Sequence, residues 1–251
     1  MMYTKLKRPL PDKGRREERE RIHKIIISLD PLRPPDKNIV GLTPGNKKTG
    51  VEGTEFNAIW VWNLPPFTTC PGASKWCSLN CYNLDDRTEV YPIDDWRTNL
   101  WLFLNEERKL QERIETQLQD SKEPCAVRIH SSGDFFSNDY IKFWAKIISD
   151  FQHITFWTYT RSWAIDELSD SIRQLSEMSN LSLFASYDLS MKKECQNYTR
   201  SLVFDTIDKM LCYQGTFGGM ICPEQFKLVG CCADCGLCMK KQNSDILFLL
   251  H

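Results

Sequence analysis

Apolar runs and amphipathic stretches alternate through the middle of the chain. Four apolar runs have the length of buried strands, and they cover residues 56–64, 125–131, 154–160 and 181–187. Three stretches carry apolar residues at helical spacing, and they cover residues 95–119, 138–151 and 164–178. Strands that alternate with helices in this way predict βα units and a parallel sheet. We therefore predict an α/β fold, a partial or full (βα) barrel.

The pattern weakens after residue 190, where residues 201–205 and 245–250 are candidates for further strands. We predict three parts: a basic N-terminal arm with an irregular lead-in, a barrel-like core and a cysteine-rich C-terminal segment, at residues 1–54, 55–215 and 216–251. The charged, mostly basic stretch at residues 5–24 is typical either of a nucleic-acid-binding arm or of a solvated arm or short helix.

Composition limits the partners of the chain. With 41% hydrophobic residues and a net charge of −1, it has no global electrostatic attraction to nucleic acid or acidic membranes. The first residues form no apolar signal segment, and no apolar run is long enough to span a bilayer. We therefore expect a cytoplasmic protein with no membrane partner.

Polar loops follow the predicted strands. In βα folds the functional loops leave the carboxyl ends of the strands, so these loops are expected to share one rim. The segments after the last three strands of the core read "HSSGDFFS", "YTRSW" and "SYDLS". They contain the candidate catalytic residues His130, Asp134 and Arg161, and the further candidates Tyr159 and Asp188.

Each candidate catalytic residue has a chemical role and a structural alternative. His130 is either a cluster ligand or proton carrier, or a hydrogen-bonded histidine of the rim. Asp134 either binds an amino group or a ribose hydroxyl, or caps the helix that follows. Arg161 either clamps a carboxylate with two hydrogen bonds, or belongs to a surface ion pair.

The main chemical feature of the sequence is its eleven cysteines. Disulfides are rare in reducing compartments, so clustered cysteines in a chain without an export signal indicate metal or cluster ligands. One group comprises Cys70, Cys77 and Cys81, and the other comprises Cys222, Cys231, Cys232, Cys235 and Cys238. The remaining three are predicted to be packing residues: Cys125, Cys195 and Cys212.

The two groups differ in the number of ligands that they offer. The first has three thiolates, one fewer than a closed zinc site needs, which suits a [4Fe–4S] cluster with one iron open to a ligand. The second can supply four thiolates for another [4Fe–4S] cluster or for zinc, and these are Cys222, Cys232, Cys235 and Cys238. We favour iron–sulfur there because zinc ribbons usually carry two separated CxxC pairs. In an alternative set, Cys231 takes the place of Cys232.

The order of strand, three-cysteine loop, helix and glycine-bearing loop resembles the first half of a radical S-adenosylmethionine (SAM) enzyme. The resemblance implies a radical-SAM-like barrel, SAM bound at the open iron and cleaved reductively, and a protein that supplies the electron. It also implies that SAM is contacted by Ser132, Gly133 and Asp134, in place of a Gly-Gly-Glu-like segment, and by Tyr82. The cysteines are separated by six and three residues, where that superfamily usually has three and two.

A second resemblance is closer and covers the chain from about residue 56 to its end. The chain is similar to the phage gene product 88 family in "NLPPFTTCPGASKWCSLNCYN", "VRIHSSGDFFSNDYIKFW", "FWTYTRS" and "CADCGLC". This resemblance identifies relatives and implies no particular reaction.

These features predict an iron–sulfur enzyme that resembles radical SAM enzymes and has an auxiliary cluster near its C-terminus. The alternative from a different class is a non-catalytic zinc-binding module that recognises nucleic acid or protein. A redox or sensor iron–sulfur protein that binds no SAM is a third interpretation. Nothing in the rim loops specifies a substrate.

Overall fold

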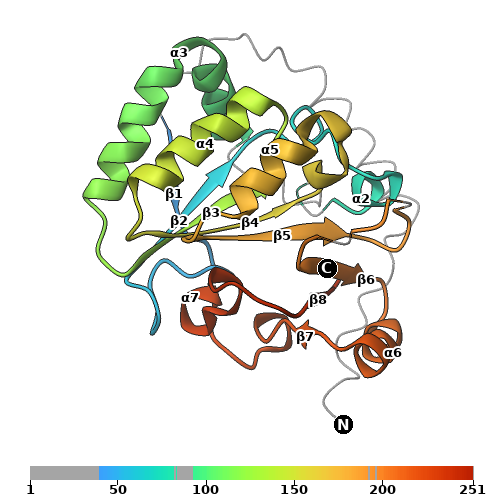
Figure 1. Ribbon diagram of the computed structural model, residues 1–251. Coiled ribbons are helices and arrows are strands. Elements are labelled where there is room, and N and C mark those ends of the chain that lie inside the picture. The colour runs from blue at the N-terminus through green and yellow to red at the C-terminus, as the bar shows by residue number, and fades with distance from the viewer. Residues whose placement is uncertain (1–39, 82, 84–92, 192, 196, 251) are drawn as a thin grey trace.

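The computed structural model describes residues 40–81, 83, 93–191, 193–195 and 197–250 (Figure 1). The basic stretch at residues 5–24 and the candidate SAM contact Tyr82 lie outside the described residues. No helix in the described ranges is both long enough and apolar enough to cross a bilayer.

An eight-stranded sheet organises the molecule. Its order is β1-β2-β3-β4-β5-β6-β8-β7, and only the pairing of β1 with β2 is antiparallel. The strands are β1 (Thr43–Pro44), β2 (Ala58–Asn63), β3 (Cys125–Ser132), β4 (Thr155–Thr160), β5 (Leu181–Tyr187), β6 (Arg200–Phe204), β7 (Met220–Ile221) and β8 (Ile246–Leu249). The prediction of an α/β fold with a largely parallel sheet is thus confirmed, while closure into a barrel stays a prediction.

Three helices cover one face of the sheet: α3 (Ile93–Gln119), α4 (Asn138–Asp150) and α5 (Asp166–Ser176) (Figure 1). Their apolar stripes and the strand residues beneath them form the main core, which includes Trp62, Trp144 and Phe156. The N-terminus and the apolar face of α4 show why the helix forms there. Ser137 Oγ accepts the Tyr140 N–H at 3.2 Å, and six residues of the helix are buried. Helix α3 departs from helical geometry at Glu106 (φ −140°, ψ 43°).

The opposite face, which we call the inner face, is covered by the C-terminal segment (Figure 1). Successive residues of a strand point to opposite faces, so Phe156 joins the helix-covered core while Trp157 lies on the inner face. There Ile59, Ala126 and Trp157 pack against Ala233 and Met239, which lie in the short helices α7 (Cys232–Cys235) and η5 (Leu237–Met239). The cysteine-rich segment is therefore part of the same packed body as the sheet.

The lead-in before β2 holds this segment in place. The backbone N–H groups of Cys232 and Ala233 donate to the carbonyls of Lys48 and Thr49 at 2.9 Å each. The Thr54 N–H donates to Asp234 Oδ1 at 3.0 Å, about 180 positions along the chain. Residues 46–55 and α7 thus form a single hydrogen-bonded unit.

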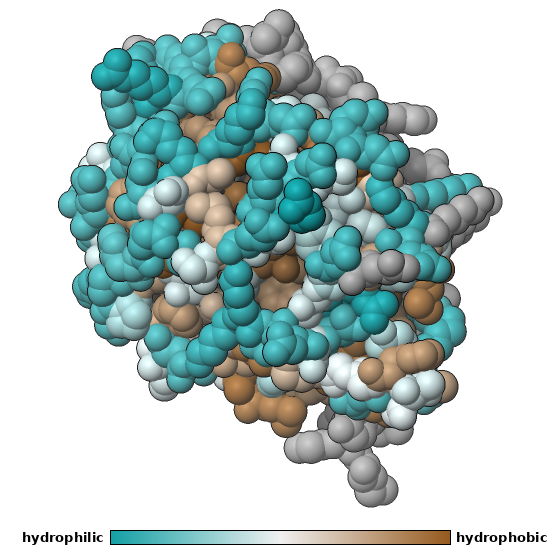
Figure 2. All heavy atoms as spheres, in the orientation of Figure 1, coloured by the Kyte–Doolittle hydropathy of each residue, from teal (hydrophilic) through white to brown (hydrophobic). Residues whose placement is uncertain are grey.

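Every predicted strand and helix of the core is present, with ends within three residues of the predicted ones. The short α2 (Lys75–Leu79), the 3-10 helices η3 (Ser162–Ala164) and η4 (Glu224–Phe226), and α6 (Ile207–Phe217) were not predicted. Only Met210 of α6 is buried, which leaves that helix without the apolar stripe that marks the others. Figure 2 shows apolar side chains gathered at the lower edge of the molecule, over the C-terminal region; the exposed Leu211, Phe217 and Leu228 belong to this region.

Candidate functional site

The loop after β2 packs across the carboxyl ends of β3, β4 and β5. Gly72 lies so close to β4 that an added Cβ would be 2.3 Å from the Arg161 carbonyl oxygen, so a side chain there would displace the loop. Ser74 begins α2, where its Oγ accepts the Cys77 N–H at 3.0 Å and donates to Asp188 Oδ2 at 2.6 Å. The expected convergence of the rim loops is thus present.

The three thiols of the first group lie close enough to interact electrostatically. Burial raises the pKa of Cys70 well above its usual value, and the charges of Asp134, Cys81 and Cys77 raise it further. Burial also raises the pKa of Cys77, while the charge of Arg161 and a hydrogen bond to its guanidinium oppose that shift. Cys70 and Cys77 are therefore protonated at neutral pH, and a metal would have to displace their protons.

Arg161 and Asp188 form a buried ion pair beside Cys77. Arg161 Nη1 donates to Asp188 Oδ2 at 2.6 Å, and their side chains are 8% and 2% exposed. The same Nη1 lies 3.1 Å from Met191 Sδ. Burial raises the pKa of Asp188, but hydrogen bonds from Ser190 and Ser74 and the charge of Arg161 outweigh it and lower the pKa overall. The predicted alternative of a surface ion pair is wrong for Arg161, because this pair is in the interior.

Asp134 ties the loop after β3 to the end of β4. Its Oδ1 accepts the Thr160 hydroxyl at 2.6 Å and the Phe135 N–H at 2.8 Å, and its Oδ2 accepts the Arg161 N–H at 2.8 Å. Burial raises the pKa of Asp134 to about 6, and the hydrogen bonds from Thr160, Arg161 and Phe135 limit the shift. Asp134 does not cap the helix that follows, which was its predicted structural alternative; Ser137 caps α4.

Ser132 and Gly133 lie beside Asp134. The Ser132 N–H donates to Asn63 Oδ1 at 2.8 Å, while its Oγ is buried and has no hydrogen-bond partner among the described residues. Gly133 has a φ of 82°, and an added Cβ would lie 2.7 Å from Leu64 Cβ and Thr69 Oγ1. Gly133 therefore lets the cysteine loop approach β3, and the buried hydroxyl of Ser132 is an atom that a ligand would satisfy.

His130 points away from the thiols into the helix-covered core. The register of β3 against β2 shifts by two residues at His130 and Ser131, and His130 has a φ of 66°. Its Nε2 lies 2.8 Å from the Tyr140 hydroxyl, and its ring stands edge-on to Phe135. Burial and then the charge of Arg128 lower the pKa of His130 to about 3, so the ring is neutral. This arrangement does not bring the His130 side chain to the cysteines, where its candidate catalytic role would place it.

The second cysteine group lies on the inner face, around Tyr159. Burial raises the pKa of Cys238 to about 12; a hydrogen bond from Tyr159 opposes this, and the charges of Cys222, Cys232 and Cys235 add to it. Cys231 packs against the same apolar cluster as Cys232 and Cys238, but its Sγ also lies 3.3 Å from Asp234 Oδ2. Of the cysteines predicted to be packing residues, Cys125 is buried and Cys195 is half-buried, whereas Cys212 is exposed, which contradicts the prediction for Cys212.

Neither group of thiols is already arranged as a set of metal ligands. Among the described residues, no three His, Cys, Asp or Glu side chains are grouped so that they could hold a metal ion. The chemistry of the donors still fits a thiophilic metal, because soft thiolates select zinc and iron–sulfur clusters. Binding at either site would need the thiol-bearing loops to close around the metal.

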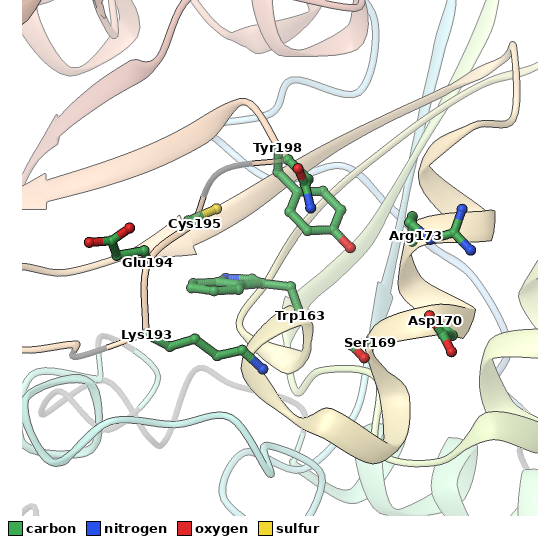
Figure 3. Close-up of a pocket in the computed structure, with 9 residues that line it drawn as sticks. Trp163, Ser169, Asp170, Arg173, Lys193, Glu194, Cys195 and Tyr198 are labelled. Atoms are coloured by element: carbon green, nitrogen blue, oxygen red, sulfur yellow. The ribbon is translucent and has the colours of Figure 1, made fainter.

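A separate surface cavity of about 330 Å³ lies beside α5 and the loop before β6 (Figure 3). Its cations already have partners, since Lys193 pairs with Asp166 at 2.5 Å and Arg173 with Glu177 at 3.0 Å. None of its lining residues is a predicted site residue; they are Trp163, Ser169, Asp170, Arg173, Lys193, Glu194, Cys195, Asn197 and Tyr198. We assign it no function.

Several residues of the two sites have no signal of their own in the sequence. Three of them resemble ordinary strand and loop residues, and only the fold brings them to the two sites: Thr160, Met191 and Arg128. Ser74 had a usable signal, because a serine three residues before Cys77 fits an N-cap that bonds the N3 amide.

The fold and the rim site define an α/β protein with a largely parallel sheet and a three-thiol site at the carboxyl ends of its strands. The gene product 88 family model matches residues 39–241, so the chain belongs to that family. It is 28% identical to the gene 88 protein of Mycobacterium phage D29 over 202 residues, and 27% identical to that of Mycobacterium phage L5 over 201 residues. Each alignment covers 72% of this chain and 81% of the phage protein. No solved structure matches the chain.

Proposed function

We propose that this member of the gene product 88 family is an iron–sulfur enzyme that binds and cleaves SAM at the rim site. Cys70, Cys77 and Cys81 would hold a [4Fe–4S] cluster that leaves one iron without a cysteine ligand. When bound, such a cluster supplies the electron that cleaves the sulfonium of SAM.

The observation that carries the proposal is the convergence of three thiols with a buried pair of opposite charges. The methionine end of SAM carries a positive amino group and a negative carboxylate. Arg161 and Asp188, in contact with each other beside Cys77, present the complementary charges.

The residues of the rim retain the hydrogen-bonding capacity that a zwitterion needs. A guanidinium has five N–H donors; in Arg161 the contacts to Asp188 and Met191 both use Nη1, and a further hydrogen bond joins the guanidinium to Cys77. A carboxylate offers about four acceptor positions; Thr160, Phe135 and Arg161 donate to Asp134, and the Ser162 hydroxyl interacts with it as well. Arg161 is therefore suited to the ligand carboxylate, and Asp134 to its amino group.

The test uses the full chain, purified anaerobically and reconstituted with iron and sulfide. Calorimetry should detect SAM binding, and dithionite-reduced protein should release 5′-deoxyadenosine. Replacing Cys70, Cys77 and Cys81 together with alanine should abolish both results. A wild-type protein with a full complement of iron that neither binds nor cleaves SAM would overturn the proposal, as would colourless protein carrying only zinc.

A substitution at Asp134 separates SAM binding from cluster assembly. Asp134→Asn should weaken SAM binding about ten- to a hundred-fold, the cost of one charge-assisted hydrogen bond, and leave the iron content unchanged. Asp166→Asn is the matched control, because Asp166 is exposed and pairs with Lys193 far from the thiols. Equal SAM affinity in the Asp134 variant and this control would remove Asp134 from the site.

A further inference from the structure

The inner face holds a group of polar and thiol side chains that the rim site does not use. Tyr159 and Arg128 project from β4 and β3, with the Arg128 guanidinium carbon 5.6 Å from the centre of the Tyr159 ring. Burial raises the pKa of Tyr159 well above its usual value, with the charge and a hydrogen bond of Cys238 among the further causes. The hydroxyl of the half-buried Tyr159 thus points at a cysteine sulfur.

Cys238 and Cys232 lie near this hydroxyl, and Cys222 and Cys235 lie near Cys238, although these thiols would have to close further around a metal. Cys222 follows β7, where its N–H donates to the Leu247 carbonyl at 3.0 Å, and its side chain is 5% exposed. Cys232 and Cys238 pack against the apolar cluster of the inner face. Cys235 is close enough for its charge to raise the pKa of Cys238, as do the charges of Cys222 and Cys232.

Cys231 stands next in sequence to this group and yet has another partner. Its Sγ is 3.3 Å from Asp234 Oδ2, and an added Cβ on Gly50 would lie 2.6 Å from that sulfur. It thus faces the lead-in turn, whereas the Cys232 N–H is fixed by the Lys48 carbonyl at 2.9 Å. The contact with Asp234 thus distinguishes Cys231 from Cys232, although the sequence spacing makes both of them possible metal ligands.

Two cations accompany the four thiols. The charges of Arg128 and Lys48 both lower the pKa of Cys232, against the effect of burial, which raises it to about 11. Four thiolates on a divalent zinc ion, or on an oxidised [4Fe–4S] core of charge 2+, carry a formal net charge of −2. Two nearby positive side chains match that charge; Glu224, which is also near, pairs with Lys227 at 3.3 Å and with Lys48 at 3.9 Å.

We propose that Cys222, Cys232, Cys235 and Cys238 bind one tetrathiolate metal centre on the inner face, with Tyr159 donating a hydrogen bond to the Cys238 sulfur and Lys48 and Arg128 as its counter-charges. The centre is independent of the rim site and of SAM. Tyr159 is a positioning residue, because it acts through a ligand and does not bind the metal itself.

The first test maps which thiols the metal protects in the wild-type chain. Metal-free reduced protein is titrated with zinc or reconstituted with iron and sulfide, alkylated, digested and analysed by mass spectrometry. We expect protection of Cys222, Cys232, Cys235 and Cys238, with Cys231 remaining reactive. Protection of Cys231 in place of Cys232, or labelling of all five, would overturn the assignment.

The second test compares single variants by metal content after anaerobic purification. Cys235→Ser should lose one zinc, or about four irons, per chain, and Cys231→Ser should lose none. An iron–sulfur centre absorbs broadly at about 400 nm, and a zinc centre does not. If Cys235→Ser fails to fold, the alkylation pattern of the wild type still decides the ligand set.

Tyr159→Phe tests the hydrogen bond to Cys238. The variant should keep the full metal content but bind the metal about 10- to 100-fold more weakly, measured by competition with a chelator. Tyr213→Phe is the control, since Tyr213 bonds Arg200 and Asp245 away from the thiols. An unchanged affinity in Tyr159→Phe would remove its proposed role. Failure of SAM binding at the rim leaves all three results unaffected.

Discussion

Arg161 carries its charge in the interior, where the loss of either partner leaves the other uncompensated. Its contact with Asp188 is 2.6 Å long and almost completely buried. Arg161→Met should therefore lower the free energy of unfolding by about 3–5 kcal/mol, measured by urea denaturation in reducing buffer.

The matched control for this prediction has the same nitrogen–oxygen distance at the surface. Lys146 and Asp150 are also 2.6 Å apart, but their side chains are 56% and 45% exposed. Lys146→Met should cost far less stability than Arg161→Met, because solvent screens the pair. Similar losses from the two substitutions would mean that burial does not govern the Arg161 pair.

His130 should make stability depend on pH with a definite sign. Its pKa is about 3 in the folded chain and about 6.5 when unfolded, so it contributes stability above pH 6.5 that is lost as pH falls toward 3. His130→Asn tolerates the positive φ and removes this titration. Relative to wild type, the variant should gain about 1.4 kcal/mol per pH unit below pH 6.5, measured by urea denaturation between pH 7.5 and 5.

His153 provides the comparison for that experiment. Its side chain is 60% exposed and lies 3.7 Å from Glu123, so His153→Asn is the control for the loss of a histidine at the surface. If the His130 and His153 variants give parallel profiles, the folded pKa of His130 is not depressed.

At the residue scale, the sequence predicted which residues lie at the rim better than it predicted where their side chains point. Asp134, Arg161 and Asp188 could be found because they follow predicted strands, and the structure does bring them to the cysteines. The direction of His130 depends on two extra residues in β3 relative to β2, which no local pattern indicates. The separation of Cys231 from Cys232 likewise depends on contacts with Gly50, far away in the chain.

At the element scale, α2 depends on Ser74, which both caps the helix and bonds Asp188. Ser74→Ala should destabilise the protein by about 1 kcal/mol and increase the alkylation rate of Cys77, because the first turn of α2 loses its cap. Peptide mapping by mass spectrometry measures that rate.

Ser137→Ala is the corresponding change in α4, where Ser137 Oγ accepts the Tyr140 N–H. It should cost a similar amount of stability and leave the alkylation of Cys77 unchanged. An equal increase in both variants would show that Cys77 responds to global stability and not to its own helix.

Elements with a strong apolar period were predictable, and those held mainly by distant contacts were not. Helices α4 and α5 each bury one stripe of residues, and β4 places its side chains alternately on two faces. Helix α7 has four residues, too few for a period, and its amides bond the carbonyls of residues 48 and 49. Such a segment takes its conformation from the rest of the fold.

At the scale of the whole molecule, the lead-in turn and α7 should open together. The Thr54 N–H donates to Asp234 Oδ1, and the Glu55 N–H donates to the Ala233 carbonyl at 3.1 Å. Asp234→Ala should speed amide hydrogen exchange in residues 46–55 and 231–236 by similar factors, because both are parts of one unit. Mass spectrometry of digested peptides measures this exchange.

Asp139→Ala removes an exposed carboxylate from the first turn of α4 and is the control for that measurement. It should leave exchange in both segments unchanged. Faster exchange in residues 231–236 with no change in 46–55 would show that the two segments open separately.

Strand β8 pairs with both β6 and β7, so the last strand of the chain lies between two strands that precede it. A protein leaves the ribosome from its N-terminus, and its earlier parts begin to fold first. Until β8 emerges, β6 has no neighbour on one side, and β7 has no partner in the sheet. Nascent chains of this protein therefore expose an open strand edge until β8 has emerged, and chains terminated before residue 246 are the ones expected to aggregate.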